Sequence, residues 1–191
     1  MSELARHQEL CEQFAALLCY PDQRVAERAA ACSVSLRQVS PAACGFLDRF
    51  RGFIEASDAS RIEEAFTGTF ELQALCHPYV GFQLCGESQQ RTMFMIKLRQ
   101  LYRQHDFTPG NDLPDHLGEL LRFLAKTSDQ NCRQEIIQEG LLPALVKMSQ
   151  GIDSENHPYL DIIMALQSFL TETAVAVGEP LSVDRQKEYL S

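Results

Sequence analysis

The feature that most constrains the fold is the spacing of apolar residues, which follows a helical repeat along almost the whole chain. Ile62, Phe66 and Phe70 recur at intervals of four, and Leu117 and Leu121 repeat the pattern further on. Residues three or four apart lie on one face of an α-helix, so each run predicts a helix with one buried side. No segment alternates apolar and polar residues as a strand does. The sequence therefore predicts an all-α protein.

Capping signals divide this pattern into about nine or ten helices. Ser40 followed by Pro41 starts one of them, because serine is a good N-cap and proline fits the first helical position. We expect one globular helical domain over residues 1–177 and a polar, frayed tail over residues 178–191. The other expected helices run from Glu3 to Tyr20, from Asp22 to about Gln38, from Asp58 or Ser60 through Phe70, from Ser88 to His105, from Pro114 to Lys126, from Asp129 to near Gly140, from there to Gly151, and from His157 onward.

The middle of the chain carries two more specific expectations. Residues 72–88 mix aromatic residues with Gly, Pro, Cys and His and show no period, so we expect a loop packed on the next helix. In that helix the residues from Met93 to Ile96 are all apolar, which is typical of a central, buried helix. The helix after it is expected to begin at Pro114 with Asp112 as its N-cap.

Charge and cysteine content limit the possible partners and location. The 191 residues carry a net charge of -9, which argues against nucleic acid as a partner, because phosphates select basic surfaces. This acidity suits either a cationic peptide partner or a surface that only keeps the protein soluble. The chain has seven cysteines, which is an odd number, and most of them lie within helical patterns. They indicate free thiols and a reducing, cytoplasmic location. The chain does not open with a signal-peptide pattern, and it has no apolar run of about 20 residues. Membrane insertion is therefore not expected.

The cysteines and histidines do not form a metal or catalytic motif. Cys76 and Cys85 are nine residues apart, and the chain has no Cys-x-x-Cys pair, so zinc binding is not expected. Cys76 beside His77 does not by itself supply a nucleophile with a positioned base. A glycine-rich phosphate loop is also missing. We therefore expect no metal site, no catalytic residue and no stably bound cofactor.

Acidic and aromatic residues are frequent between residues 62 and 119. Within this stretch, Asp115 and His116 open an expected helix, where the dipole stabilises an acid. The simpler interpretation is that Asp115 caps the helix and that His116 makes its hydrogen bonds within the fold. The alternative is a binding site for an amphipathic peptide that carries arginine, because carboxylates pair with guanidinium groups and an aromatic groove buries apolar side chains. The residues that suggest it are Glu64, Glu71, Glu87, Asp115 and Glu119, with Phe66, Phe70, Tyr79, Phe82 and Tyr102.

Three blocks of this region resemble a known protein family. EEAFTGTFEL (63–72), GESQQR (86–91) and LPDHLGELLRFLA (113–125) occur in the order found in the cytoplasmic assembly chaperones of molybdoenzymes, the TorD/NarJ group, and are most similar to the nitrate reductase delta-subunit type. Phe66 stands where the family usually has tyrosine, and Thr92 where it has glycine. Residues 76–79 depart from the nitrate reductase pattern, so the resemblance does not specify the enzyme served, which we call the client.

The resemblance implies a TorD/NarJ-like chaperone fold and a non-enzymatic function. The protein would bind the N-terminal segment of the catalytic subunit of a molybdenum oxidoreductase, either a twin-arginine signal or its vestige. It would hold the apo-subunit while bis-molybdopterin guanine dinucleotide is inserted, before membrane assembly or export. We expect a monomer or a domain-swapped dimer. A small helical enzyme or a regulatory interaction domain unrelated to molybdoenzymes is the alternative.

The resemblance and the residue types together predict ten peptide-binding residues. Among them Arg91 also fits a structural role, paired with an acid inside the fold, and the two phenylalanines also fit the core. The ten are Phe66, Phe70, Glu71, Tyr79, Glu87, Arg91, Tyr102, Asp115, His116 and Glu119.

Overall fold

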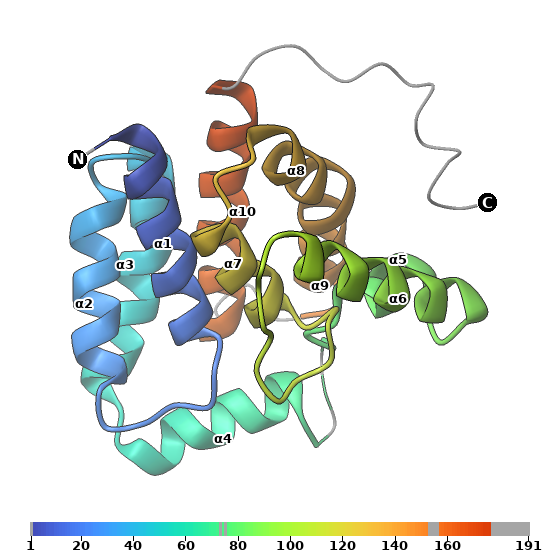
Figure 1. Ribbon diagram of the computed structural model, residues 1–191. Coiled ribbons are helices and arrows are strands. Elements are labelled where there is room, and N and C mark those ends of the chain that lie inside the picture. The colour runs from blue at the N-terminus through green and yellow to red at the C-terminus, as the bar shows by residue number, and fades with distance from the viewer. Residues whose placement is uncertain (1, 73, 75, 153–156, 177–191) are drawn as a thin grey trace.

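The computed structural model is a bundle of helices, without a strand in the residues that it describes (Figure 1). These are residues 2–72, 74, 76–152 and 157–176, so the predicted polar tail lies outside them. The predicted all-α fold is confirmed. The helical elements are α1 (Glu3–Leu17), α2 (Val25–Leu36), α3 (Pro41–Ala56), α4 (Ala59–Phe70), α5 (Val80–Cys85), α6 (Gln89–Gln104), α7 (Leu117–Lys126), α8 (Gln130–Glu135), the π-helical segment η1 (Ile136–Leu141), α9 (Leu142–Gln150) and α10 (Pro158–Ala176).

The core lies around α10, which packs against α3 and α9, and around α7, which packs against α1. Aromatic side chains join these layers. Phe14 of α1 stacks on Phe169 of α10 with ring centroids 5.8 Å apart, and Phe50 of α3 meets Tyr159 of α10 edge to face at 5.5 Å. All four side chains are fully buried, and complete burial of a side chain such as phenylalanine contributes about 1.5–3 kcal/mol.

Two predicted helix starts are confirmed by their caps. The Asp58 carboxylate accepts a hydrogen bond from the amide of Arg61 at 2.9 Å, and the Ser88 hydroxyl accepts one from the amide of Arg91 at 3.3 Å. Each cap satisfies an amide that has no partner within the first turn of a helix. α4 and α6 therefore begin where the local sequence predicts.

The segment between α4 and α6 differs from the predicted loop, because residues 80–85 form α5. Val80 and Gly81 are its buried residues, and Gly86 ends it with a φ of 65°, a conformation that glycine adopts without strain. Six residues are too few to show a helical period in the sequence. The prediction of a loop over the whole of residues 72–88 was therefore wrong.

The prediction that α6 is central and buried was also wrong. Met93 is 49% exposed and Ile96 is 42% exposed, and the buried residues of this helix are Arg91, Leu98 and Tyr102. In Figure 1, α6 lies with α5 at the right-hand side of the molecule, away from α1, α2 and α3. Met93 and Ile96 thus reach the surface, whereas Phe94 between them is partly buried against the core.

Two further boundaries differ from the prediction. α7 begins at Leu117 instead of Pro114, because His116 and not Asp112 caps it. The two helices expected on either side of Gly140 are joined by η1 into one continuous helical path. Pro143 lacks an amide hydrogen and clashes with the carbonyl four residues earlier in a regular α-helix, and the wider π turn relieves that clash.

Candidate functional site

Backbone pairing brings the predicted site residues Tyr79 and His116 together. The two residues face each other in an isolated antiparallel bridge, beside which the amide of Val80 donates to the carbonyl of Asp115 at 2.7 Å. Their rings meet edge to face with centroids 5.4 Å apart. The segments that precede α5 and α7 therefore form one local structure, although they are far apart in the sequence.

A buried ion pair lies behind these rings. Arg91 Nε donates to Asp115 Oδ2 at 2.8 Å, and Arg91 Nη2 donates to Asp115 Oδ1 at 3.4 Å. Arg91 Nη1 also donates to Glu87, whose side chain is 73% exposed. Asp115 is fully buried, and its hydrogen bond raises the pKa of Arg91, so the guanidinium remains charged. Arg91 therefore has the structural role that was its alternative interpretation.

Gly81 allows α5 to approach this ion pair closely. A Cβ atom at position 81 would lie 2.8 Å from Asp115 Oδ2, which is closer than such atoms approach in proteins. The rings of Tyr79 and Phe82 then cover the guanidinium of Arg91, with ring centres 5.2 Å and 5.8 Å from its Cζ. Aromatic faces attract a guanidinium and exclude water from it. The sequence around Gly81 shows no helical periodicity, so it gave no signal that this glycine permits the close approach of α5 to the ion pair.

His116 and Asp112 complete the surface of the site. His116 Nδ1 accepts a hydrogen bond from the amide of Gly118 at 3.1 Å, and burial lowers the pKa of the ring, which is therefore neutral at pH 7. Burial also raises the pKa of Tyr79, and the negative charge of Asp112 adds to that shift. Asp112 is thus an exposed acid beside both rings, a role that the sequence analysis missed. We call Tyr79, Glu87, Asp112 and His116 the Tyr79–His116 cluster.

Tyr102 and Glu119 are interior residues that hold the segment between α6 and α7. The Tyr102 hydroxyl donates to the carbonyl of Pro114 at 2.8 Å. The Glu119 carboxylate accepts from the amide of Gly110 at 3.0 Å and from Arg122 Nη1 at 2.7 Å. Both side chains are almost completely buried. They therefore position, from the interior, the segment that carries Asp112 and His116.

The remaining predicted residues lie at α4. Phe66 and Phe70 are buried and meet Tyr159 of α10 edge to face, with ring centroids 5.6 Å and 5.2 Å away, so the core role holds for both. Glu71 follows them and is exposed. The ten predicted residues thus occupy three places: five lie at the Tyr79–His116 cluster and its ion pair, two lie under the segment before α7, and three lie at α4.

A separate groove of about 570 Å³ lies beside α4. Tyr20 precedes Pro21 of this groove and packs edge to face on Phe66. The pKa of its hydroxyl is raised by desolvation, the largest cause, and by the charges of Glu63 and Glu71. This groove combines apolar walls with acids but shares no residue with the Tyr79–His116 cluster. Its lining is Pro21, Asp22, Gln23, Arg24, Val25, Ala59, Ile62 and Glu63.

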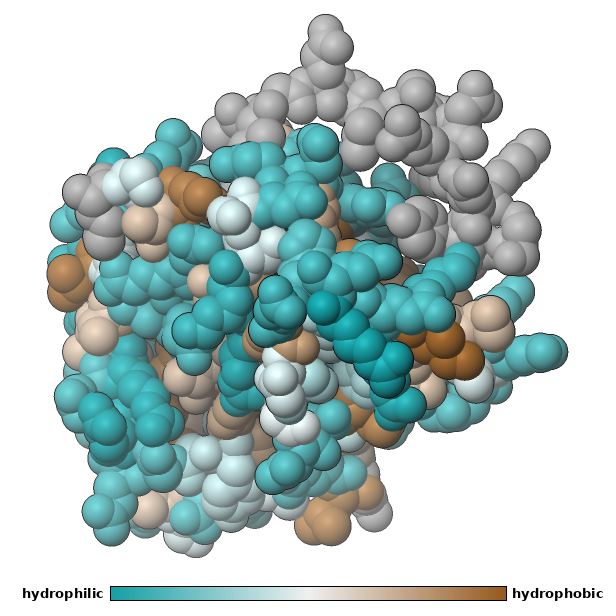
Figure 2. Space-filling model, in the orientation of Figure 1, coloured by the Kyte–Doolittle hydropathy of each residue, from teal (hydrophilic) through white to brown (hydrophobic). Residues whose placement is uncertain are grey.

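α6 adds an apolar surface close in the chain to the Tyr79–His116 cluster. Met93 and Ile96, three residues apart, lie on neighbouring positions of the helix and are both exposed. Figure 2 shows a hydrophobic patch at the right of the molecule, over α6, with hydrophilic surface around it. Methionine adapts its shape readily to different apolar partners. We call Met93 and Ile96 the α6 apolar face.

Two further findings concern metals and membranes. In the described part of the chain, no three His, Cys, Asp or Glu side chains are grouped so that they could hold a metal ion. No helix among the same residues combines the length and the apolar character needed to span a bilayer.

All seven cysteines are free, and burial raises the pKa of Cys32 and of Cys76 to about 12, so these two thiols remain protonated.

The fold and the site define an all-α protein whose candidate site presents acids, aromatic rings and apolar side chains for binding. The fold is similar to the crystal structure of a protein described as a redox enzyme maturation protein from Archaeoglobus fulgidus, with a TM-score of 0.59, 14% identity, and coverage of 86% of this chain and 93% of that one. At that identity the likeness shows the fold alone. None of the curated proteins compared with the chain matches it.

A model of the nitrate reductase delta subunit family matches residues 36–174. The chain therefore belongs to the nitrate reductase delta subunit family, and the resemblance carried by the three sequence blocks is confirmed. All three blocks lie within the matched region.

Proposed function

We propose that the protein is a chaperone for the assembly of a molybdenum-containing oxidoreductase. It binds the N-terminal segment of the catalytic apo-subunit, of twin-arginine type or vestigial. It holds that subunit in the cytoplasm for insertion of bis-molybdopterin guanine dinucleotide, before membrane assembly or export. The observation that carries this proposal is the family match over residues 36–174. The protein itself catalyses no reaction, and the molybdenum cofactor belongs to the client.

We assign the client segment to the Tyr79–His116 cluster and the α6 apolar face. Glu87 and Asp112 are exposed carboxylates that can each pair with an arginine of the client. The carboxylate of Glu87 has lone pairs left after its bond to Arg91, because a carboxylate accepts about four hydrogen bonds. Met93 and Ile96 offer the apolar contact. The buried pair of Arg91 and Asp115 holds this surface in shape and does not itself meet the client.

Calorimetric titration with a synthetic peptide tests the ionic part of this proposal. The peptide is the first 30 or so residues of the client's catalytic subunit, and its control has both arginines replaced by glutamine. Hydrogen bonds to charged groups are worth about 1.5–3 kcal/mol, so Glu87→Gln and Asp112→Asn should each weaken binding about tenfold or more. The matched control is Glu12→Gln, because Glu12 is an exposed acid of α1, a helix that lies away from α6 in Figure 1. Binding should also weaken as salt is raised from about 0.05 M to about 0.5 M.

A second pair of variants tests the apolar part and separates the two candidate surfaces. The double variant Met93→Ser, Ile96→Ser should weaken binding of the peptide. Val34→Ser, at a position of α2 that is 61% exposed, should leave peptide binding unchanged. Tyr20→Ser probes the groove beside α4. Loss of binding in Tyr20→Ser alone would move the client to that groove. If no N-terminal peptide binds and no molybdenum oxidoreductase subunit co-purifies with the protein from its cells, the proposed function is wrong.

A further inference from the structure

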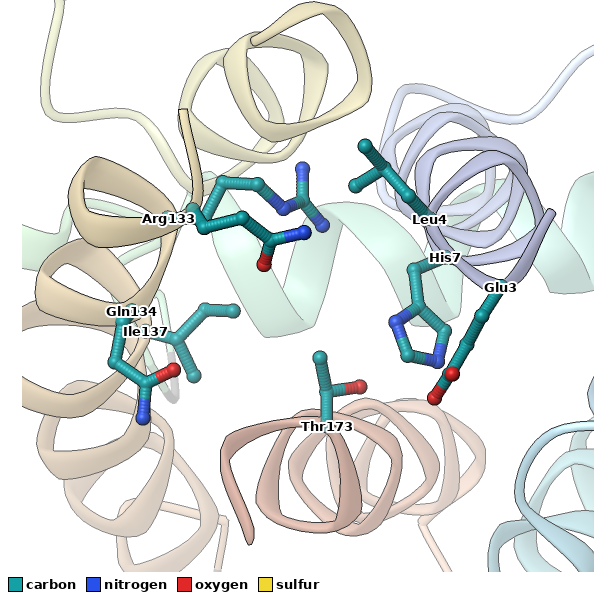
Figure 3. Close-up of a pocket in the computed structure, with 8 residues that line it drawn as sticks. Glu3, Leu4, His7, Arg133, Gln134, Ile137 and Thr173 are labelled. Carbon is teal, nitrogen blue, oxygen red and sulfur yellow. The ribbon is translucent and has the colours of Figure 1, made fainter. Parts of the chain in front are cut away.

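A small pocket lies between the start of α1, the start of α8 and the last turns of α10 (Figure 3). Its volume is about 120 Å³, which is room for about four water molecules at their share of liquid volume. None of its residues belongs to the Tyr79–His116 cluster. Its apolar walls are Leu4 and Ile137, and its polar walls are Glu3, His7, Gln130, Arg133, Gln134 and Thr173.

Arg133 is a buried cation without a carboxylate partner. The residue is 4% exposed, and its Nη1 donates to the carbonyls of Leu124 and Thr127 at the end of α7. Its Nη2 is buried and has no hydrogen-bond partner. The thiol of Cys11 nearby keeps its proton, because burial raises its pKa to about 11, and so cannot neutralise the guanidinium. Among the described residues, no acid forms an ion pair with Arg133, although buried charges are normally paired.

The unsatisfied guanidinium is turned into the pocket. Figure 3 shows the end of the Arg133 side chain extending from its helix toward Leu4, with the ring of His7 on the wall formed by α1 and Thr173 on the wall formed by α10. Burial is the main cause that lowers the pKa of His7; the charge of Glu3 acts to raise it, and the smaller effects of Arg133 and Arg6 act to lower it. The ring of His7 therefore lies among two arginines and one exposed acid, and Arg133 is the buried cation of the pocket.

We propose that this pocket binds a small oxyanion, such as sulfate, phosphate or a short carboxylate, with Arg133 Nη2 as its principal donor. Guanidinium, amide and imidazole N–H groups are the donors that oxyanions accept from in proteins. Gln130 supplies the amide and His7 the imidazole. Because Arg133 also bonds the last carbonyls of α7, a bound anion fixes the contact between α7 and α8 and stabilises the folded protein.

Thermal unfolding and calorimetry of the full chain test the site with sulfate, phosphate and acetate as separate probes. Chloride at equal ionic strength is the reference. At least one probe should bind saturably and raise the unfolding temperature above the chloride value. Sulfate keeps its charge between pH 5 and 8, so its affinity should rise toward pH 5 as His7 gains a proton and with it a second N–H donor. His7→Phe, which keeps the edge-to-face contact with Phe169, should flatten that pH dependence.

Variants at the rim distinguish this pocket from general charge effects. Gln130→Ala should weaken binding of the probe about fivefold, which corresponds to the loss of one hydrogen bond. Asn131→Ala is the matched control, because Asn131 is exposed and the next residue in α8 but does not line the pocket. Gln130 is exposed too, so both variants should fold. No saturable binding beyond chloride, or equal binding by wild type, Gln130→Ala and His7→Phe, would show that the pocket holds only water.

Discussion

Replacement of Asp115 by alanine is expected to destabilise the fold strongly. Asp115 is fully buried and accepts two hydrogen bonds from Arg91, whose side chain is 7% exposed. Loss of one partner of a buried ion pair costs about 3–5 kcal/mol, because the other charge stays buried. Glu87 remains as a partner of Arg91 but is exposed, which favours the lower end, about 3 kcal/mol. For a chain of this length, that free energy corresponds to a fall in unfolding temperature of about 6–12 °C.

Urea unfolding followed by circular dichroism measures this effect. Arg91→Met in the Asp115→Ala background should restore part of the lost stability, because it removes the buried unpaired charge. The matched control is Asp112→Asn, at an exposed acid three residues away, which should change stability by less than about 0.5 kcal/mol. A cost below about 1 kcal/mol for Asp115→Ala, or a double variant less stable than the sum of both single changes, would refute the reasoning.

Three further predictions follow from the same contacts. Gly81→Ala should cost about 1–3 kcal/mol in urea unfolding, because its Cβ would meet the neighbouring carboxylate, whereas Gly68→Ala, in open space within α4, should stabilise by about 0.5–1 kcal/mol. Equal effects at both glycines would contradict this. Burial lowers the pKa of His7 and His116. The free energy of unfolding should therefore be highest above about pH 6.5 and fall as the pH is lowered through that value, because the unfolded chain then binds more protons. A urea midpoint that stays constant between about pH 7.5 and 5.5 would disprove this. Tyr102→Phe should cost about 1–3 kcal/mol in thermal unfolding, because a buried carbonyl loses its donor, and a change of less than about 0.5 kcal/mol would count against that bond.

Features that depend on neighbouring residues in the chain could be predicted from the sequence. Asp58 and Ser88 cap helices through amides three residues further on, so the types and spacing of the residues suffice. Phe66 and Phe70 fall on one face by helical spacing alone. α5 could not be found in this way, because a helix of six residues has no period to detect.

Burial and long-range pairing could not be predicted, because they depend on which elements meet. Met93 and Ile96 have the residue types of a core helix, but they lie on a side of α6 that remains exposed. The sequence suggested that Arg91 pairs with an acid inside the fold, but it did not indicate that Asp115, from the segment before α7, is that acid. Two of the acids expected to face a peptide, Asp115 and Glu119, are therefore buried, whereas Glu71 and Glu87 are exposed.

The construction of α6 separates two properties of the protein. Its inner side is anchored by Arg91, Leu98 and Tyr102, which span 12 residues, with about 16 Å of helix axis between the first and the last. Its outer side carries Met93 and Ile96, whose side chains contribute little to the core. If the proposed client segment binds this outer side, substitutions there can alter which client is recognised while the domain keeps its stability, so that one scaffold can diverge to serve different enzymes.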